Sequence, residues 1–183
     1  MSFVSLDIPD VKVFSLKKFG DDRGYFSETY SEKLLQSAGI NVRFVQDNQS
    51  LSKEKGIIRG LHMQAPPFDQ AKLVRVNRGR ILDVCVDVRR SSPTYGNWVA
   101  AEISEQAWNQ IYVPSGFLHG FVTLEEDTEV HYKVSNFYDR NSEGGVIWND
   151  PTLAIDWPLD RSPILSEKDQ LLPKFADFET PFA

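Results

Sequence analysis

The sequence predicts a mainly β protein, folded as a sandwich or barrel of short strands. Many short runs are strand-like in their apolar pattern, and glycines and prolines separate these runs in ones and twos. The first half of the chain also contains only one convincing helix. The length of 183 residues and the hydrophobic fraction of 41% suit an ordinary core, so residues 1–183 are expected to form a single domain.

The expected strands begin with residues 11–16, where apolar and polar side chains largely alternate, as in a strand with one buried face. A turn at residues 21–24 follows, and residues 25–30 resume with aromatic side chains. Further strand-like runs cover residues 42–45, 57–62, 71–76, 81–88, 98–103, 110–113, 117–124 and 128–134. Turns at residues 77–79 and 114–116 each contain a glycine and separate neighbouring strands.

Two short helices complete the expected elements. Ser31 is a typical N-cap residue, residues 32–38 follow as a helix, and Gly39 ends it. Near the C-terminus, Ser166 is expected to cap a helical turn over residues 167–171.

The composition excludes several classes of partner. The formal net charge is −6, from 20 basic and 26 acidic residues, and the basic residues form no stripe, so no nucleic acid is expected as a partner. No run approaches the roughly 18 apolar residues of a membrane span, and residues 1–10 show no signal-peptide pattern. The single Cys85 lies in a largely apolar run, which predicts a buried, reduced thiol in a cytoplasmic protein.

Three histidines are the first candidates for chemistry. His62 lies near the end of an expected strand, and His119 ends a Pro-x-Gly-x-x-His motif that starts at Pro114. His131 lies between Val130 and Tyr132 along a strand without a motif, so it is expected to be a surface or packing residue.

The Pro-x-Gly-x-x-His motif resembles the second short motif of the cupin superfamily, in which a turn leads into a strand and aims the histidine into a barrel. Metal-binding cupins supply His-x-His and a nearby glutamate in a first motif, but here the corresponding stretch is His62-Met-Gln64. A set of His62, Gln64 and Lys72 is an unconvincing metal site, so neither a metal nor another cofactor is expected.

Eight segments, in order along the chain, resemble the dTDP-4-dehydrorhamnose 3,5-epimerase family. They begin at Asp22-Arg-Gly-Tyr-Phe-Ser-Glu28 and continue through Phe44-Val-Gln-Asp-Asn-Gln-Ser50, Arg59-Gly-Leu-His62, Lys72-Leu-Val74, Asp83-Val-Cys-Val-Asp-Val-Arg89, residues 114–121, Trp148-Asn-Asp-Pro151 and Leu165-Ser-Glu-Lys-Asp169. The resemblance implies a cupin-like jelly-roll β-barrel or sandwich with a few short helices. It implies an epimerase that inverts C3 and C5 of dTDP-4-dehydro-6-deoxy-D-glucose to give dTDP-4-dehydro-L-rhamnose.

Four residues carry the catalytic roles that the resemblance implies. His62 is the base, because imidazole is suited to proton abstraction near neutral pH, and Asp169 holds it in the right tautomer. Lys72 stabilises the oxyanion that forms on the C4 oxygen, and Tyr132 is the acid. Without the resemblance, each has a plain structural interpretation: a core histidine, a surface carboxylate, a solvated lysine and a packing tyrosine.

The resemblance also implies the residues that bind the substrate. Arg23 and Arg59 suit the diphosphate, which a guanidinium grips through forked hydrogen bonds. Tyr138 resembles the aromatic residue that stacks on thymine. The remaining expected contacts are Phe26, Glu28, Gln46, Asp47, Asn48, His119, Glu143 and Lys168. The family is homodimeric, which implies that the N-terminal residues Arg23, Phe26 and Glu28 complete the site of the neighbouring chain.

Other functions remain open at this point. A metal-dependent cupin oxygenase or isomerase would carry a bound transition metal. A sugar-nucleotide binding protein would bind the substrate without exchanging its protons. A relative that inverts only C3 or only C5 would use the same base and acid.

Overall fold

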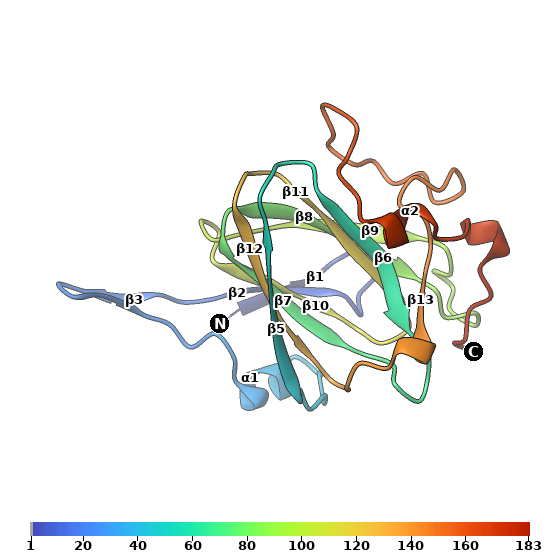
Figure 1. Cartoon of the computed structure of the whole chain (residues 1–183). Coiled ribbons are helices and arrows are strands. Elements are labelled where there is room, and N and C mark those ends of the chain that lie inside the picture. The colour runs from blue at the N-terminus through green and yellow to red at the C-terminus, as the bar shows by residue number, and fades with distance from the viewer. Residues whose placement is uncertain (1) are drawn as a thin grey trace.

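The structure, a computed structural model, describes residues 2–183 and contains two antiparallel sheets that face each other (Figure 1). The six-stranded sheet has the order β1 (Ser2–Ser5), β2 (Lys12–Ser15), β10 (Asn109–Val113), β7 (Lys72–Arg78), β12 (Thr128–Val134) and β5 (Gln46–Ser52). The five-stranded sheet has the order β13 (Glu143–Gly145), β6 (Ile58–Gln64), β11 (Phe117–Thr123), β8 (Arg80–Asp87) and β9 (Trp98–Ser104). The predicted mainly β class is confirmed.

The helices are few and short. Helix α1 (Glu32–Ser37) covers part of the outer face of the six-stranded sheet, and α2 (Glu167–Gln170) lies beside β6. Single 3-10 turns occur at Arg140–Ser142 and Phe175–Asp177. Ser166 caps α2 as predicted, since its hydroxyl accepts a hydrogen bond from the backbone of Asp169. Ser31 occupies the N-cap position of α1, but its side chain makes no capping hydrogen bond. Within residues 2–183, no helix is long and apolar enough to cross a lipid bilayer.

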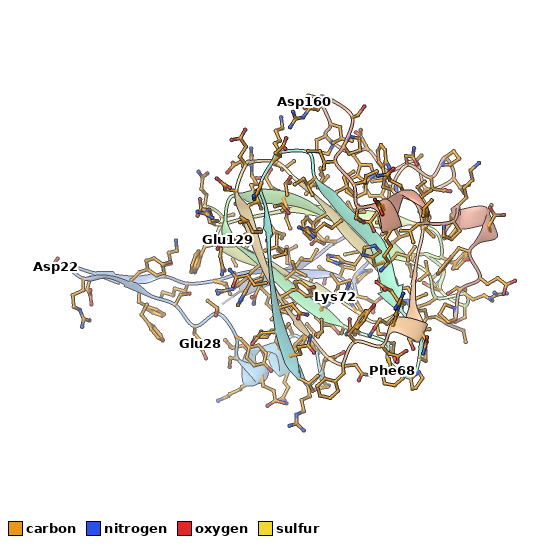
Figure 2. The ribbon with its side chains drawn as sticks, viewed as in Figure 1. Asp22, Glu28, Phe68, Lys72, Glu129 and Asp160 are labelled. Atoms are coloured by element: carbon orange, nitrogen blue, oxygen red, sulfur yellow. The ribbon has the colours of Figure 1, made fainter. Side chains whose placement is uncertain are left out.

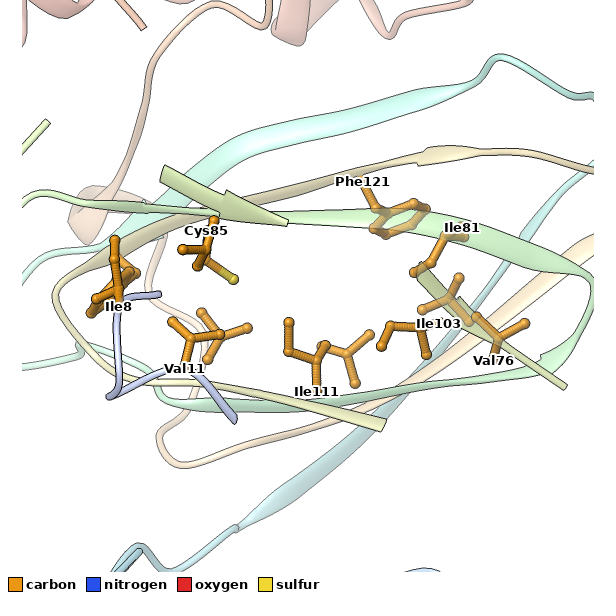
Figure 3. Close-up of a cluster of buried hydrophobic side chains, with 13 residues drawn as sticks. Ile8, Val11, Val76, Ile81, Cys85, Ile103, Ile111 and Phe121 are labelled. Atoms are coloured by element: carbon orange, nitrogen blue, oxygen red, sulfur yellow. The ribbon is translucent and has the colours of Figure 1, made fainter. Parts of the chain in front are cut away.

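The core between the sheets consists mostly of aliphatic side chains, with Cys85 and Phe121 among them (Figure 3). Valines and isoleucines of β7, β8, β9 and β10 meet there because alternate residues of each strand point inward. Cys85 is a free and fully buried thiol, as the sequence predicts. Burial raises its pKa well above the ordinary value, so the thiol stays neutral.

A second apolar layer covers the outer face of the five-stranded sheet. Residues 146–182 wrap around this face, and Val146, Leu153 and Trp157 are buried against it. The C-terminal segment also joins the start of β6, where the backbone of Ile164 exchanges hydrogen bonds with Gly56 and Ile58. The segment that carries α2 is therefore fastened to the strand that carries His62.

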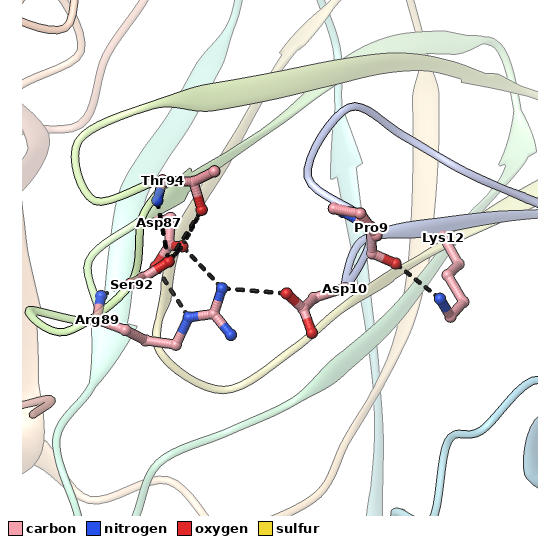
Figure 4. A network of polar contacts seen from close by, with 7 residues as sticks. All are labelled: Pro9, Asp10, Lys12, Asp87, Arg89, Ser92 and Thr94. Atoms are coloured by element: carbon pink, nitrogen blue, oxygen red, sulfur yellow. Dashed lines mark hydrogen bonds and ion pairs between the residues drawn. The ribbon is translucent and has the colours of Figure 1, made fainter.

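A polar network joins the loop after β8 to the N-terminal loop (Figure 4). The carboxylate of Asp87, completely buried, accepts hydrogen bonds from Arg89 Nε at 2.9 Å, Ser92 Oγ at 2.5 Å and Thr94 Oγ1 at 2.6 Å. Arg89 also pairs with Asp10 at 3.2 Å. Burial opposes the charge on Asp87, but these hydrogen bonds outweigh it and lower its pKa to about 2.

Most predicted strands are confirmed within one or two residues, but the prediction for residues 42–45 is wrong. That run is irregular, and β5 begins only at Gln46. The strand Gln-Asp-Asn-Gln-Ser-Leu-Ser alternates in burial rather than in hydrophobicity, because the side chains of its inner face are polar and its outer face meets solvent. Strands β1 and β13 were not predicted.

A β-hairpin formed by β3 (Phe19–Asp21) and β4 (Gly24–Phe26) projects away from the barrel (Figure 1). The predicted turn at residues 21–24 is its tip, whereas the aromatic run at 25–30 leaves the strand after Phe26. The hairpin carries large exposed apolar side chains: Phe19 is 51%, Tyr25 57% and Phe26 69% exposed. Side chains of this kind on a projecting arm are typical of a contact surface.

Candidate active site

A cavity of about 470 Å³ opens between the two sheets. Its walls come from β5, β6, β7, β11 and β12 and from the segment around α2. The sequence-predicted residues that line it are Arg59, His62, Lys72, His119, Tyr132, Lys168 and Asp169. Lys72 lies near the middle of the barrel in Figure 2. One cavity thus brings together the four predicted catalytic residues from distant parts of the chain.

His62 and Asp169 form a hydrogen-bonded dyad. The Nε2 atom of His62 lies 2.6 Å from Oδ1 of Asp169, although the two residues are 107 positions apart. Asp169 is buried within α2, so the interpretation of it as a surface charge is wrong. Burial raises the pKa of Asp169, but hydrogen bonds from His62, Ser166 and the Gly60 backbone outweigh that effect and lower it. Asp169 is therefore an anion whose hydrogen bond orients the imidazole ring.

Lys72 belongs to a second chain of contacts, which runs from β7 of the six-stranded sheet to β11 and β8 of the sheet that carries His62. Its Nζ lies 3.4 Å from Nδ1 of His119, and Nε2 of His119 lies 2.8 Å from Oδ2 of Asp83. Burial, together with the nearby Lys72 charge, lowers the pKa of His119 against the opposing effect of Asp83. A neutral His119 donates Nε2–H to the Asp83 carboxylate, which leaves the Nδ1 lone pair facing the ammonium of Lys72.

The sequence does not single out Asp83, which is completely buried in the structure. A signal was present, because a carboxylate in the apolar run at 81–88 shares one strand face with Ile81 and Cys85. Cys85 Sγ lies 3.7 Å from the other carboxylate oxygen of Asp83. Burial lowers the pKa of Lys72, whereas the charge of Asp83 raises it, so Asp83 supports the ammonium form.

Tyr132 reaches the cavity from the six-stranded sheet, opposite the sheet that carries His62. In β12 it pairs with Asn48 of β5 and with Val74 of β7. Burial raises the pKa of its phenol against the smaller effects of Arg59 and a hydrogen bond with Asn48. The phenol therefore keeps its proton near neutral pH, as a proton donor must.

Arg59 is held at the rim of this cavity. Its Nε donates to Ser52 Oγ at 3.2 Å and its Nη2 to the Leu51 carbonyl, also at 3.2 Å, while the side chain stays exposed. A guanidinium fixed on one edge keeps its other donors free for an anion.

The predicted Gln46–Asn48 cluster is divided between the two faces of β5. Gln46 and Asn48 point the same way, and the amide of Gln46 donates to Asn48 Oδ1 at 2.8 Å. Asp47 points to the opposite face, where it bonds Lys133 Nζ at 2.8 Å. Asp47 does not line the main cavity, because successive strand residues face opposite sides, and its role in substrate binding stays a prediction.

Tyr138, Glu143 and Lys168 form a chain of contacts beside the cavity. The hydroxyl of Tyr138 donates to Glu143 Oε2 at 2.9 Å, and Glu143 also pairs with Lys168, which lines the cavity. Tyr138 lies beyond the end of β12 at Val134, so it does not share a strand face with Tyr132. It is 58% exposed, as an aromatic platform for a ligand would be.

Arg23, Phe26 and Glu28 lie outside the cavity of their own chain. Arg23 is at the tip of the hairpin and pairs with Asp21, and Glu28 follows the hairpin's second strand (Figure 2). None of the three lines the main cavity. The structure of one chain therefore separates these predicted substrate contacts from the other candidates.

Within residues 2–183, no group of three or more His, Cys, Asp or Glu side chains is arranged to hold a metal ion. Gln64, which stands where metal-binding cupins have a second histidine, has its amide bonded to backbone atoms instead. The residues present offer acid, base and oxyanion chemistry.

Comparison with known proteins identifies the family. A family model described as dTDP-4-dehydrorhamnose 3,5-epimerase matches residues 5–177. A dTDP-4-dehydrorhamnose 3,5-epimerase of Sinorhizobium fredii is 48% identical over 182 residues, which cover 100% of this chain and 93% of the relative. The chain belongs to the dTDP-4-dehydrorhamnose 3,5-epimerase family. This family is one of isomerases, so the expectations of an enzyme and of an epimerase are confirmed.

Solved structures of dTDP-4-dehydrorhamnose 3,5-epimerases share the fold. The Bacillus anthracis protein, with TDP and pyrophosphate bound, superimposes with a TM-score of 0.92 at 46% identity and covers 95% of this chain and 99% of its own. A Legionella pneumophila 3,5-epimerase in complex with dTDP-4-keto-L-rhamnose gives a TM-score of 0.92 at 39% identity, covering 97% and 94%. The predicted cupin-like barrel is confirmed.

Proposed function

We propose that this chain inverts C3 and C5 of dTDP-4-dehydro-6-deoxy-D-glucose and so forms dTDP-4-dehydro-L-rhamnose. One observation carries the proposal: the His62–Asp169 dyad and the phenol of Tyr132 enter one cavity from opposite sheets. Inversion at carbon needs a base and an acid on opposite faces of the sugar, and this arrangement supplies both.

The reaction begins when His62 removes a proton from C3 or C5. Both carbons are α to the C4 ketone, so either abstraction places negative charge on the same C4 oxygen. The ammonium of Lys72 stabilises that oxyanion, and His119 and Asp83 hold the ammonium in place. Tyr132 then delivers a proton to the other face of the carbon.

Each inversion leaves His62 protonated and Tyr132 ionised. Asp169 offsets the charge of the imidazolium through the 2.6 Å contact. The second inversion requires the first charge state again, so His62 must lose its proton and Tyr132 must regain one. Exchange with solvent restores both groups, and solvent hydrogen therefore enters the product at each inverted carbon.

Substrate binding uses a few basic residues that gather locally, although the chain as a whole has a formal charge of −6. Arg59 and Lys168 line the cavity near its mouth and suit the diphosphate. Tyr138 offers its exposed ring to the nucleobase. The binding of a dTDP-sugar by the Legionella pneumophila relative supports this class of substrate.

The second part of the proposal is a homodimer in which the hairpin of one chain completes the site of the other. The exposed ring of Phe26 supports it, and so does the position of Arg23 and Glu28 outside the main cavity of their own chain. We also place the reaction in the cytoplasm, since the chain has one free, reduced thiol.

Proton exchange in D2O tests the proposal. The purified protein is incubated with dTDP-4-dehydro-6-deoxy-D-glucose and EDTA, and deuterium at C3 and C5 is followed by NMR. Label at both carbons is expected from wild type and none from His62→Ala. The matched control is His131→Ala. His131 lies on the outer face of the sheet, so this variant should introduce deuterium into the substrate as wild type does.

Each other result favours a different function. Label at one carbon alone would make the chain a single-carbon epimerase. Exchange that occurs when EDTA is omitted but not when EDTA is present would support a metal-dependent enzyme. Binding of the substrate with no label above the His62→Ala control would leave a sugar-nucleotide binding protein.

A further inference from the structure

Gln64 is a buried amide at the end of β6 whose hydrogen-bonding groups are all turned to backbone atoms. It is 5% exposed. Its Nε2 donates to the carbonyl of Phe68 at 2.7 Å and to that of Phe137 at 3.1 Å. Its Oε1 accepts from the backbone N–H of Asp139 at 2.7 Å. One side chain thus ties two loops, residues 65–71 and 135–139, to the strand of His62.

Two of these three bonds flank Tyr138, on the residue before it and on the residue after it. The hydroxyl of Tyr138 is held separately by Glu143, which pairs with Gln64 in the register of β13 and β6. The backbone and the tip of Tyr138 are therefore fixed from neighbouring strands, while 58% of the residue stays exposed. An exposed aromatic ring would otherwise sample several orientations.

We propose that Gln64 is a positioning residue for nucleotide recognition: it holds residues 137–139 so that the ring of Tyr138 is ready to receive the nucleobase of the substrate. This inference rests on the proposed function, in which Tyr138 binds the base. A ring that is already in place loses less conformational freedom when the ligand binds, so affinity is gained without a new contact to the ligand.

An amide is the side chain that these three backbone groups require, because they offer two acceptors and one donor. Gln64→Met keeps the length of the side chain but removes all three bonds and leaves the backbone groups of the loops unpaired. Gln70→Met is the matched control. Gln70 binds the same loop through the Asn136 carbonyl at 2.8 Å, but it makes no bond on either side of Tyr138.

The test measures the affinity for TDP by calorimetry, since this ligand carries the nucleobase and reports no catalysis. Gln64→Met should weaken TDP binding by about tenfold, and Gln70→Met should leave it near the wild-type value. If Gln64 acts through the ring, Gln64→Met combined with Tyr138→Ala should bind no more weakly than Tyr138→Ala alone. In turnover assays, KM of Gln64→Met should rise by about tenfold while kcat stays within about threefold.

Three results would overturn the inference: wild-type TDP affinity in Gln64→Met, additive losses in the double variant, or a large fall in kcat with an unchanged KM. If Gln64→Met does not fold, Gln64→Asn replaces it, because the shorter amide keeps its chemistry but reaches fewer of the three groups. It must show the same split between KM and kcat. Failure of wild type to bind TDP would instead contradict the proposed function.

Discussion

Asp83 offers a quantitative test of how the cavity keeps Lys72 charged. Replacement of Asp83 by Asn removes a buried negative charge but preserves the shape of the side chain. Two contacts, of 2.8 Å and 3.4 Å, link the carboxylate through the ring of His119 to the ammonium. Together with the width of an imidazole ring they place the two charges within about 8 Å of each other, where Coulomb's law at an effective dielectric constant of about 20 gives about 2 kcal/mol.

That energy corresponds to a factor of about 30 in the ratio of ammonium to amine at Lys72. The sign follows from the charges: Asp83 raises the pKa of Lys72, so its loss lets the ammonium deprotonate at lower pH. The other groups that face Lys72 are His119, Cys85 and Glu143, and Asp83→Asn leaves them in place. The alkaline limb of kcat should therefore move to lower pH, with the largest loss of rate above neutral pH.

The assay is kcat against pH for Asp83→Asn, with thermal unfolding to verify the fold. Cys85→Ala is the control, because it removes the other contact of Asp83 but keeps the charge and the bond to His119. It should show the wild-type profile. An Asp83→Asn profile that coincides with wild type, or a Cys85→Ala profile that shifts equally, would refute the electrostatic link from Asp83 to Lys72.

Four further outcomes are expected. Tyr132→Phe should lower kcat by about 10²-fold or more without weakening TDP binding, because it loses only the proton donor. Asp169→Asn should lower kcat by about 10²-fold or more, measured by the same NMR exchange. Asp87, with a pKa of about 2, contributes about 2 kcal/mol to the free energy of unfolding above pH 3.8. This contribution disappears as the pH falls toward 2, so the unfolding midpoints of wild type and Asp87→Asn should converge in acid. Arg23→Ala should be inactive like His62→Ala, and mixing the two should restore part of the activity, because one site of the mixed dimer then carries both native residues.

Each of these outcomes has a clear opposite. Weaker TDP binding in Tyr132→Phe would assign the phenol to substrate anchoring. Undiminished exchange in Asp169→Asn would show that the carboxylate does not assist His62 as a base. If the difference in stability between wild type and Asp87→Asn stays constant down to acid pH, the stabilisation by Asp87 comes from packing and not from its charge. Mixtures that stay inactive, although exchange of subunits is shown by mass, would place Arg23 and His62 in the site of the same chain.

The regular strands of the barrel could be predicted because their burial follows their hydrophobicity. Strand β12 (Thr128–Val134) was predicted to the residue, since its inward side chains are apolar over most of its length. Strand β5 was missed because its inner face is polar, and a period of two among polar residues leaves no hydrophobic signal. The hydrophobic pattern thus fails at a strand whose inner face is polar, although the other strands around the cavity follow it.

The candidate catalytic residues could be located in sequence only through resemblance to a family. His62 and Asp169 lie 107 positions apart, and no periodicity relates them. Asp83 carried a signal, a charge in an apolar strand, but its partner His119 comes from another strand. The role of Gln64 depends on backbone groups of two loops, and loop conformation is the least readable part of a sequence.

The wrapping of the C-terminal segment over the five-stranded sheet has a consequence for the order in which activity arises. The strands of both sheets end at Gly145, but the carboxylate that orients His62 comes from Asp169, which the ribosome adds later. A nascent chain that has been synthesised as far as its last strand already contains Tyr132 and Lys72. It still lacks the carboxylate that hydrogen-bonds the imidazole of His62. Competence as a base therefore arrives with the final segment, which also buries part of the outer face of the five-stranded sheet.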